Sequence, residues 1–330
     1  MKLFQSASGS TYYTQEKPFA KGGEGQIYDV INYYDRVVKI YTNDKRTEHQ
    51  ERKLKQMLTV KLDSNVAKQF AWPIDIIYDN GEFVGFAMNK IKGVALNRIN
   101  SDEYKDMPLS KKITIAKNLC AAVDSLHQTG NVIGDLNPNN VLVETGSGFV
   151  RLIDCDSFHI SASKNRVYRC EVAMPDYLAP SVSRELAGGE SLKTAHLPTF
   201  TIESDLFSLG IHIFQLLMQG THPFAMAVKN TSQKSVTLPQ PSENMKKGVF
   251  TYYNCPSGFK PPLYALPFKM LPENLRKLFI KCFSHGETVS AEEWFDALCE
   301  YEKNLKTCKR NPNHEYRKGL YRCPYCALNS

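Results

Sequence analysis

The chain has 330 residues, 42% of them hydrophobic and 23% charged, and a formal net charge of +7 at pH 7. This length permits two lobes with hydrophobic cores, and the ordinary counts of 17 Pro and 19 Gly argue against a fibrous or largely disordered chain. Basic residues are in excess near the C-terminus, where a solvated surface is the simpler explanation and nucleic-acid binding is not expected.

The N-terminal residues and the cysteines bear on the cellular compartment. The first ten residues contain no apolar run, so no secretory signal is expected, and no stretch approaches the roughly 18 apolar residues of a membrane span. We therefore expect a cytoplasmic protein that does not contact a membrane. Five cysteines lie in apolar or strand-like surroundings typical of buried thiols in a reducing compartment: Cys120, Cys155, Cys170, Cys282 and Cys299.

The first hundred residues are rich in short strand patterns. β-Branched and aromatic residues between turn residues predict strands at 26–31, 35–41, 71–79 and 82–89. One helix interrupts them over residues 48–58, with its buried face expected at Leu54, Met57 and Leu58.

Helical patterns dominate after Ser110. Apolar residues at spacings of three and four predict a helix that follows Ser110 as its N-cap and ends at Gly130. Two short strands follow, then a loop of about 25 residues, long enough to suggest a functional segment, and then further helices. A strand-rich N-terminal part followed by a helix-rich C-terminal part predicts an α+β fold with two lobes.

A glycine cluster between the first predicted strands is a candidate phosphate-binding loop. Gly22, Gly23 and Gly25 carry no Cβ atom, so the backbone can come close to an anionic ligand, although such a cluster is more often a plain turn. Lys39, in mid-strand among apolar residues, favours the phosphate interpretation because a buried ammonium needs a partner. It could instead extend along the strand edge to solvent.

A glutamate in the first predicted helix could be the partner of Lys39. Glu51 shares the expected inward face with Leu54 and Leu58. Glu48, one turn earlier, is the weaker candidate.

The most specific pattern lies between residues 126 and 158. Asp135 is followed five residues later by Asn140, and a predicted strand then leads to Asp154. Any one of these residues could merely cap a turn. Together with Lys39 and Glu51, each on the expected element, they resemble the motif set of protein kinases.

This resemblance covers roughly residues 12–305 and implies roles for the five residues. Lys39, paired with Glu51, would hold the α- and β-phosphates of ATP. Asp135 would accept the proton of the attacking hydroxyl, and Asn140 and Asp154 would bind magnesium. The implied fold is bilobal, with an N-lobe at 1–92 and a C-lobe at 93–305.

Further segments extend the resemblance. Residues 85–93 are similar to a kinase hinge, with Met88 as gatekeeper and Asn89 to Ile91 facing adenine. Ile27, beside the glycine cluster, is expected to contact the nucleotide as well. Asp205, in a segment similar to the central C-lobe helix, would bond back to the catalytic loop.

The motifs GGEG, GDLNPNN and DxDSF, with a C-terminal CPxC, resemble a bacterial subgroup of Hanks-type (eukaryotic-like) serine/threonine protein kinases. Members of this subgroup are often encoded beside PP2C-type phosphatases and von Willebrand A-domain proteins. The resemblance implies protein substrates, with these two classes as further partners.

Several positions depart from the kinase pattern. Gly134 replaces the arginine that reads an activation-loop phosphate, so activation by phosphorylation is not expected. Asn137 and Met174 replace a lysine and a threonine that usually act together, which suggests an altered substrate site. Asp156 replaces a glycine and adds a third carboxylate, which could bind or tune a second magnesium or simply be solvated.

The C-terminal residues 306–330 contain a separate candidate metal site. Cys308, His314, Cys323 and Cys326 provide three thiols and one imidazole with the spacing of a closed Cys3His zinc sphere. Because large apolar side chains are few here, we expect a small zinc-ribbon-like module, distinct from the kinase core, that folds around zinc. Unrelated surface cysteines and a redox CxxC are the alternatives.

The function predicted is an ATP- and Mg²⁺-dependent kinase that transfers the γ-phosphate to Ser/Thr of proteins, including itself. Two alternatives stay open: a nucleotide-binding pseudokinase or scaffold, and a kinase-fold enzyme that transfers another group such as AMP.

Overall fold

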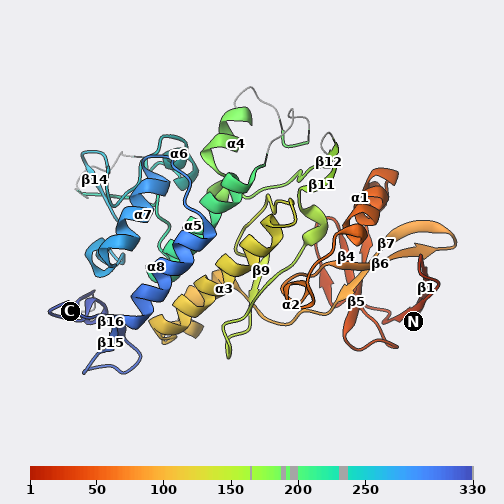
Figure 1. The fold of residues 1–330 in the computed structure, drawn as a ribbon, viewed down its shortest axis with the longest axis horizontal. Helices are drawn as coiled ribbons and strands as arrows, with labels where there is room; N and C mark the ends of the chain where they lie inside the picture. The colour runs from red at the N-terminus through yellow and green to blue at the C-terminus, as the bar shows by residue number, and fades with distance from the viewer. Residues whose placement is uncertain (164–165, 187–190, 194–199, 230–236, 329–330) are drawn as a thin grey trace.

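The structure is a computed structural model that describes residues 1–163, 166–186, 191–193, 200–229 and 237–328. A strand-rich part lies at one end and a helical part at the other (Figure 1), which agrees with the predicted α+β class. Within the described residues, no helix is both long and apolar enough to cross a bilayer.

The strand-rich part is one antiparallel sheet of seven strands in the order β2-β1-β6-β7-β5-β4-β3. The four predicted strands are present within two residues at each end. The sequence analysis missed the first hairpin, β1–β2, which extends the sheet beyond β6. The strands are β1 Lys2–Ser6, β2 Thr11–Thr14, β3 Ala20–Lys21, β4 Gly25–Asp29, β5 Arg36–Tyr41, β6 Pro73–Asp79 and β7 Glu82–Asn89.

Helix α1 (Glu48–Thr59) packs against β6 and carries a buried face different from the predicted one. Leu54 and Met57 are fully buried as expected, but Leu58 is 39% exposed and Lys53 takes its place in the interior. The buried face of α1 is therefore rotated toward Lys53, and Glu51 lies at the border between the buried and the exposed face. The short helix α2 (Ser64–Ala67) follows.

The helical part is built around α3 (Leu109–His127), which packs between α5 (Ile202–Leu217) and α8 (Ala291–Lys303). The N-cap of α3 is Pro108, not Ser110 as predicted. Small strands and short helices complete this part: β8 Val94–Ala95, β9 Val141–Val143, β10 Val150–Leu152, β11 Ile160–Ser163, β12 Arg166–Tyr168, β13 Ala227–Val228, β14 Phe259–Lys260, α4 Pro180–Glu185, α6 Pro241–Lys246 and α7 Glu273–Phe283.

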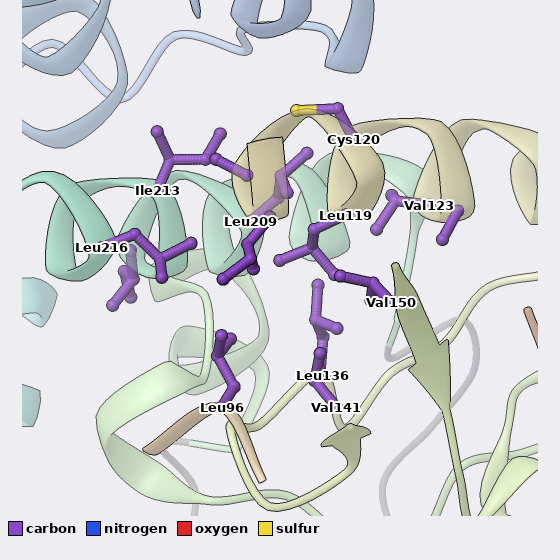
Figure 2. Packing of buried hydrophobic residues seen from close by; sticks show 14 of the residues in the cluster. Leu96, Leu119, Cys120, Val123, Leu136, Val141, Val150, Leu209, Ile213 and Leu216 are labelled. Carbon is purple, nitrogen blue, oxygen red and sulfur yellow. The ribbon is translucent and has the colours of Figure 1, made fainter. Parts of the chain in front are cut away.

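The core between α3 and α5 reaches directly under the segment that contains Asp135. Figure 2 shows Leu119 of α3 and Leu209 of α5 packed toward Leu136 and Val141. Leu136 is 1% exposed and follows Asp135 in the chain, so the apolar core fixes the backbone of the polar loop. Four of the five cysteines expected to be buried are buried, whereas Cys299 is only partly so.

The C-terminal segment is a hairpin of β15 (Leu305–Thr307) and β16 (Glu315–Arg317) followed by α9 (Pro324–Leu328), close to the start of α3 (Figure 1). Glu315 accepts a hydrogen bond from the backbone N–H of Ser110 in the first turn of α3, at 2.6 Å. Tyr316 and Tyr325 are buried in the same apolar cluster as the C-lobe helices. These two tyrosines therefore pack against the C-lobe helices, and the separate module at 306–330 stays a prediction.

Candidate active site

Asp205, on α5, holds the loop that contains Asp135. Its fully buried carboxylate accepts hydrogen bonds from the backbone N–H groups of Ile133 and Gly134, at 2.7 and 2.8 Å. His127, at the end of α3, lies 2.9 Å from the same carboxylate through Nε2. The contact predicted from Asp205 back to this loop is confirmed.

Gly134 stands where a side chain cannot be placed. Its φ is +81°, and a Cβ atom would lie 2.7 Å from the Cβ of Cys170. The position requires a glycine because L side chains rarely adopt this backbone conformation and because Cys170 occupies the adjacent space. The sequence departure at Gly134 therefore has a local structural reason.

The carboxylate of Asp135 is oriented by its neighbours. The side-chain amide of Asn137 donates to Oδ2 at 2.8 Å, and the backbone N–H of Met174 donates to Oδ1 at 3.1 Å. Asn140 donates its side-chain amide to the backbone carbonyl of Asp135 at 3.2 Å. Asn137 and Met174, two residues that depart from the kinase pattern, are thus direct partners of this carboxylate, together with Asn140, whose side-chain amide also donates to Oδ2 at 3.4 Å.

Asp154 lies next to Asn140 because the N–H of Ile153 donates to the carbonyl of Asn140, at 2.9 Å. Asp154 has φ +60°, a left-handed conformation that is uncommon outside glycine and that clusters at functional sites. Its side chain is 38% exposed. The structure brings Asp135, Asn140 and Asp154 together, and Asp154 faces solvent.

Lys39, on β5, reaches the carboxylates of Asp154 and Asp156. Its ammonium donates to Asp154 at 2.6 Å and to both oxygens of Asp156 at 2.9 and 2.8 Å. Burial lowers the pKa of Lys39, but the charges of Asp156 and Asp154 outweigh burial and hold it above its ordinary value. Burial tends to raise the pKa of Asp156, yet Lys39 holds it below its ordinary value, so the pair is charged at neutral pH.

Glu51 does not pair with Lys39, contrary to the prediction. Its carboxylate accepts a hydrogen bond from the hydroxyl of Tyr78 at 2.7 Å and pairs with Lys55 at 2.6 Å. The physical reason is the rotated buried face of α1, which directs Gln50 rather than Glu51 toward β5. Gln50 donates to the hydroxyl of Tyr41 at 2.8 Å.

The glycine cluster and the hinge-like segment flank this site. In the β4–β5 register Ile27 lies opposite Lys39. A Cβ at Gly25 would approach the carbonyl of Ile40 to 2.5 Å, so Gly25 is needed for strand packing, whereas Gly23 has no atom within 4 Å of its Cβ position. Gly22 is similarly open, with its nearest neighbour at 4.0 Å.

The hinge-like residues follow directly along the chain. Met88 is 7% exposed, Asn89 ends β7, and Ile91 is partly buried against the same apolar cluster as Ile27. The open space around Gly22 and Gly23 suits phosphates, and apolar side chains such as Ile27 and Ile91 suit the base of a nucleotide.

Sequence comparison agrees with this geometry. Residues 13–285 match the protein kinase domain family. The chain belongs to the protein kinase family. It is 28% identical to the protein kinase YegI of Escherichia coli strain K12 over an alignment of 354 residues, which covers 100% of this chain and 50% of that protein.

Eukaryotic kinases are similar over shorter stretches. The chain is 36% identical to the serine/threonine-protein kinase mrck-1 of Caenorhabditis elegans over 140 residues, 42% of this chain and 8% of that protein. The Drosophila melanogaster serine/threonine-protein kinase Lok is 32% identical over 162 residues, 48% of this chain and 29% of Lok. The chain spans about half the length of the YegI proteins it matches.

Sequence reasoning missed two members of the kinase site's polar network and did not assign the role of a third. It left the role of Asp156 open, and it did not single out Tyr41 or Gln50. Tyr41 donates its hydroxyl to Asp156 at 2.6 Å. Tyr41 lies two residues after Lys39 and therefore on the same side of the strand, and this spacing could have predicted that the two side chains are neighbours.

The four predicted zinc ligands come together at the C-terminal end of the kinase domain. The ligand atoms of Cys308, His314, Cys323 and Cys326 all lie within 4.8 Å of one another. Cys308 and Cys326 have their sulfurs 3.8 Å apart, and His314 Nδ1 lies 3.5 Å from the Cys326 sulfur. Tetrahedral zinc with ordinary bond lengths would space such atoms at about 3.8 and 3.6 Å. The donor set and its spacing therefore fit zinc.

Proposed function

We propose that this chain is an ATP- and Mg²⁺-dependent protein kinase that phosphorylates Ser/Thr of protein substrates, including itself. The observation that carries the proposal is the grouping of Asp135, Asn140 and Asp154 beside the buried Lys39. Phosphoryl transfer depends mainly on positioning and charge stabilisation, so one lysine, two carboxylates and one amide suffice for its chemistry.

In this proposal Lys39 binds phosphate oxygens of ATP, while Ile27, Met88, Asn89 and Ile91 contact the base, and Gly22, Gly23 and Gly25 form the loop over the phosphates. The position of Ile27 opposite Lys39 in the β4–β5 register supports this arrangement.

Asp135 accepts the proton of the substrate hydroxyl. The hydroxyl oxygen then forms a bond to the γ-phosphorus as the bond to the β–γ bridging oxygen breaks, and ADP leaves. Asn137 and the N–H of Met174 keep the Asp135 carboxylate oriented for this step.

Asn140 and Asp154 carry the amide and carboxylate oxygens that Mg²⁺ prefers, and they would hold the ion. Asn140 uses its amide nitrogen toward Asp135, which leaves its oxygen for a metal, and the partly exposed Asp154 has an open side toward solvent. The bound ion would neutralise charge on the phosphates.

The test is to incubate the purified protein with ATP and MgCl₂ and to measure its intact mass. Addition of phosphate, mapped by fragmentation to Ser or Thr, supports the proposal, and addition of a nucleotide monophosphate supports the AMP-transferring alternative. Asp154→Ala and Lys39→Ala should abolish the mass shift, with Glu48→Gln, an exposed residue of α1, as the control. A wild-type protein that binds ATP without transfer would support the pseudokinase alternative.

We further propose that Cys308, His314, Cys323 and Cys326 hold a structural zinc ion. Four protein ligands leave no open position, which suits a structural or docking role rather than catalysis. Protein substrates follow from the kinase assignment. PP2C-type phosphatase and von Willebrand A-domain partners remain predictions, to be tested by co-purification.

A further inference from the structure

Lys39 and Asp156 form a buried ion pair at the base of the site. Their side chains are 8% and 1% exposed, and the ammonium lies within hydrogen-bond distance of both carboxylate oxygens of Asp156. Such a pair is held in one geometry because any separation would leave a buried charge unpaired.

Both carboxylate oxygens of Asp156 accept hydrogen bonds from described residues. Oδ1 accepts from Lys39, and Oδ2 accepts from Lys39 and from the hydroxyl of Tyr41. Asp154, two residues earlier, is by contrast partly open to solvent. Its burial and its three hydrogen bonds disagree with simple solvation of this third carboxylate and favour a role as the partner of Lys39.

Within the described residues, the hydrogen bonds that connect helix α1 to the Lys39–Asp156 pair run through neutral groups. Gln50 donates to Tyr41, and Tyr41 donates to Asp156. Glu51 is engaged elsewhere, by Tyr78 of β6 and by Lys55 one turn along the helix. The charged partner of Lys39 is therefore carried by the segment that follows β10, not by the helix.

We propose that Asp156 is the positioning residue for Lys39, in the place that the kinase resemblance gives to Glu51. This inference rests on the proposed phosphate-binding role of Lys39. Asp156 lies in the short 3₁₀ helix η4 (Cys155–Ser157), and Asp154 is the N-cap of that helix. One short segment therefore carries both the partner of Lys39 and the candidate metal ligand. The ion pair thus joins β5 to the turn after β10, and α1 supplies neither of its two members.

The experiment compares Asp156→Asn with Glu51→Gln, both close in shape to the native residue, in the full chain. We measure kcat and KM for ATP with Mg²⁺, and separately the affinity for ADP in EDTA by calorimetry. Asp156→Asn should lower kcat/KM by about 100-fold or more, as expected for a displaced phosphate ligand, and should weaken metal-free ADP binding. Glu51→Gln should change either quantity by less than about threefold, as expected for a partly exposed ion pair.

A double-mutant cycle separates positioning from a general structural role. In a Lys39→Met background, Asp156→Asn should cause almost no further loss of ADP affinity, because its effect passes through the lysine. Full additivity would overturn the proposal. If Asp156→Asn does not fold, Tyr41→Phe removes one hydrogen bond of Asp156 and should lower kcat/KM by about three- to tenfold, and an unchanged value there would overturn it.

The two proposals fail in different ways. If Glu51→Gln is as defective as Asp156→Asn in an active enzyme, the inference is wrong and the kinase function stands. If the wild-type protein transfers no phosphate but ADP binding depends on Asp156 and not on Glu51, the inference stands and the proposed activity is wrong.

Discussion

Asn137 donates its side-chain amide to the carboxylate of Asp135 across 2.8 Å. Many serine/threonine kinases have a lysine here, so in this chain a neutral amide orients the candidate base. The contact is short and local, and it is open to a direct test.

Asn137→Ala should lower kcat by about tenfold or more, because the carboxylate of Asp135 loses the shortest of the three hydrogen bonds that described residues donate to it. Steady-state kinetics with saturating ATP measures the effect. The control is Asn139→Ala: Asn139 is exposed and bonds to Asn97 instead, and its loss should change kcat by less than about twofold. Equal rates for Asn137→Ala and wild type would contradict the orienting role.

Gly134→Ala should destabilise the protein by about 1–3 kcal/mol, because φ at this position is +81° and the new Cβ would meet Cys170. Urea unfolding at pH 7.5 gives the free energy of unfolding. Gly146→Ala is the matched control, since no atom lies within 4 Å of its Cβ position. If both variants are as stable as wild type, the backbone requirement at Gly134 is absent.

The purified protein should contain about one zinc ion per chain, held by the Cys3His cluster. Cys323→Ser combined with Cys326→Ser should remove the zinc, as measured by elemental analysis, whereas Cys255→Ser, outside the cluster, should retain it. The double variant should also melt at a lower temperature, because Glu315 and Tyr325 pack on the kinase domain. A zinc-free wild-type protein whose C-terminal segment resists proteolysis would show that these cysteines are ordinary thiols.

Stability should fall as the pH is lowered from about 7 to about 4. Burial lowers the pKa of His212 to about 4, so in this window the unfolded chain binds a proton that the folded chain does not. A shift from an ordinary value near 6.5 corresponds to at most roughly 3 kcal/mol for this residue. His159 and His222, whose pKa values burial also lowers to about 4, add to the effect.

His212→Gln should flatten the pH dependence of the free energy of unfolding, whereas His285→Gln, at an exposed site, should leave it unchanged. His212 Nε2 also lies 2.9 Å from the carbonyl oxygen of Leu136. Because the substitution disturbs this hydrogen bond, His212→Gln should have a lower free energy of unfolding than wild type at pH 7.5. Parallel curves for the variant and wild type would show that His212 does not titrate in this window.

The local sequence determined the parts of this protein that depend on short spacings. β-Branched and aromatic residues between turn residues predicted four strands of the sheet, and the resemblance of the segment with Asp135, Asn140 and Asp154 to kinase motifs predicted the kinase family, which the domain comparison confirmed. The grouping of four cysteine and histidine residues near the C-terminus was also predicted, because a CxxC pair and two nearby donors have the spacing of a tetrahedral metal site.

Only the tertiary structure decided which carboxylate pairs with Lys39. Spacing along the helix predicted that Glu51 faces the interior, but in the structure α1 is rotated slightly about its axis relative to that prediction. Glu51 therefore lies beside Tyr78 and Lys55, and Lys53 is buried instead. Asp156 is 117 residues from Lys39 in the chain, and a pairing over that distance depends on how the sheet meets the loop after β10. The hydrogen bond from Ser110 of α3 to Glu315 of β16 also joins residues that are far apart in the chain, so the sequence did not predict it. A local pattern specifies a helix or strand, but contacts between distant elements depend on how those elements pack.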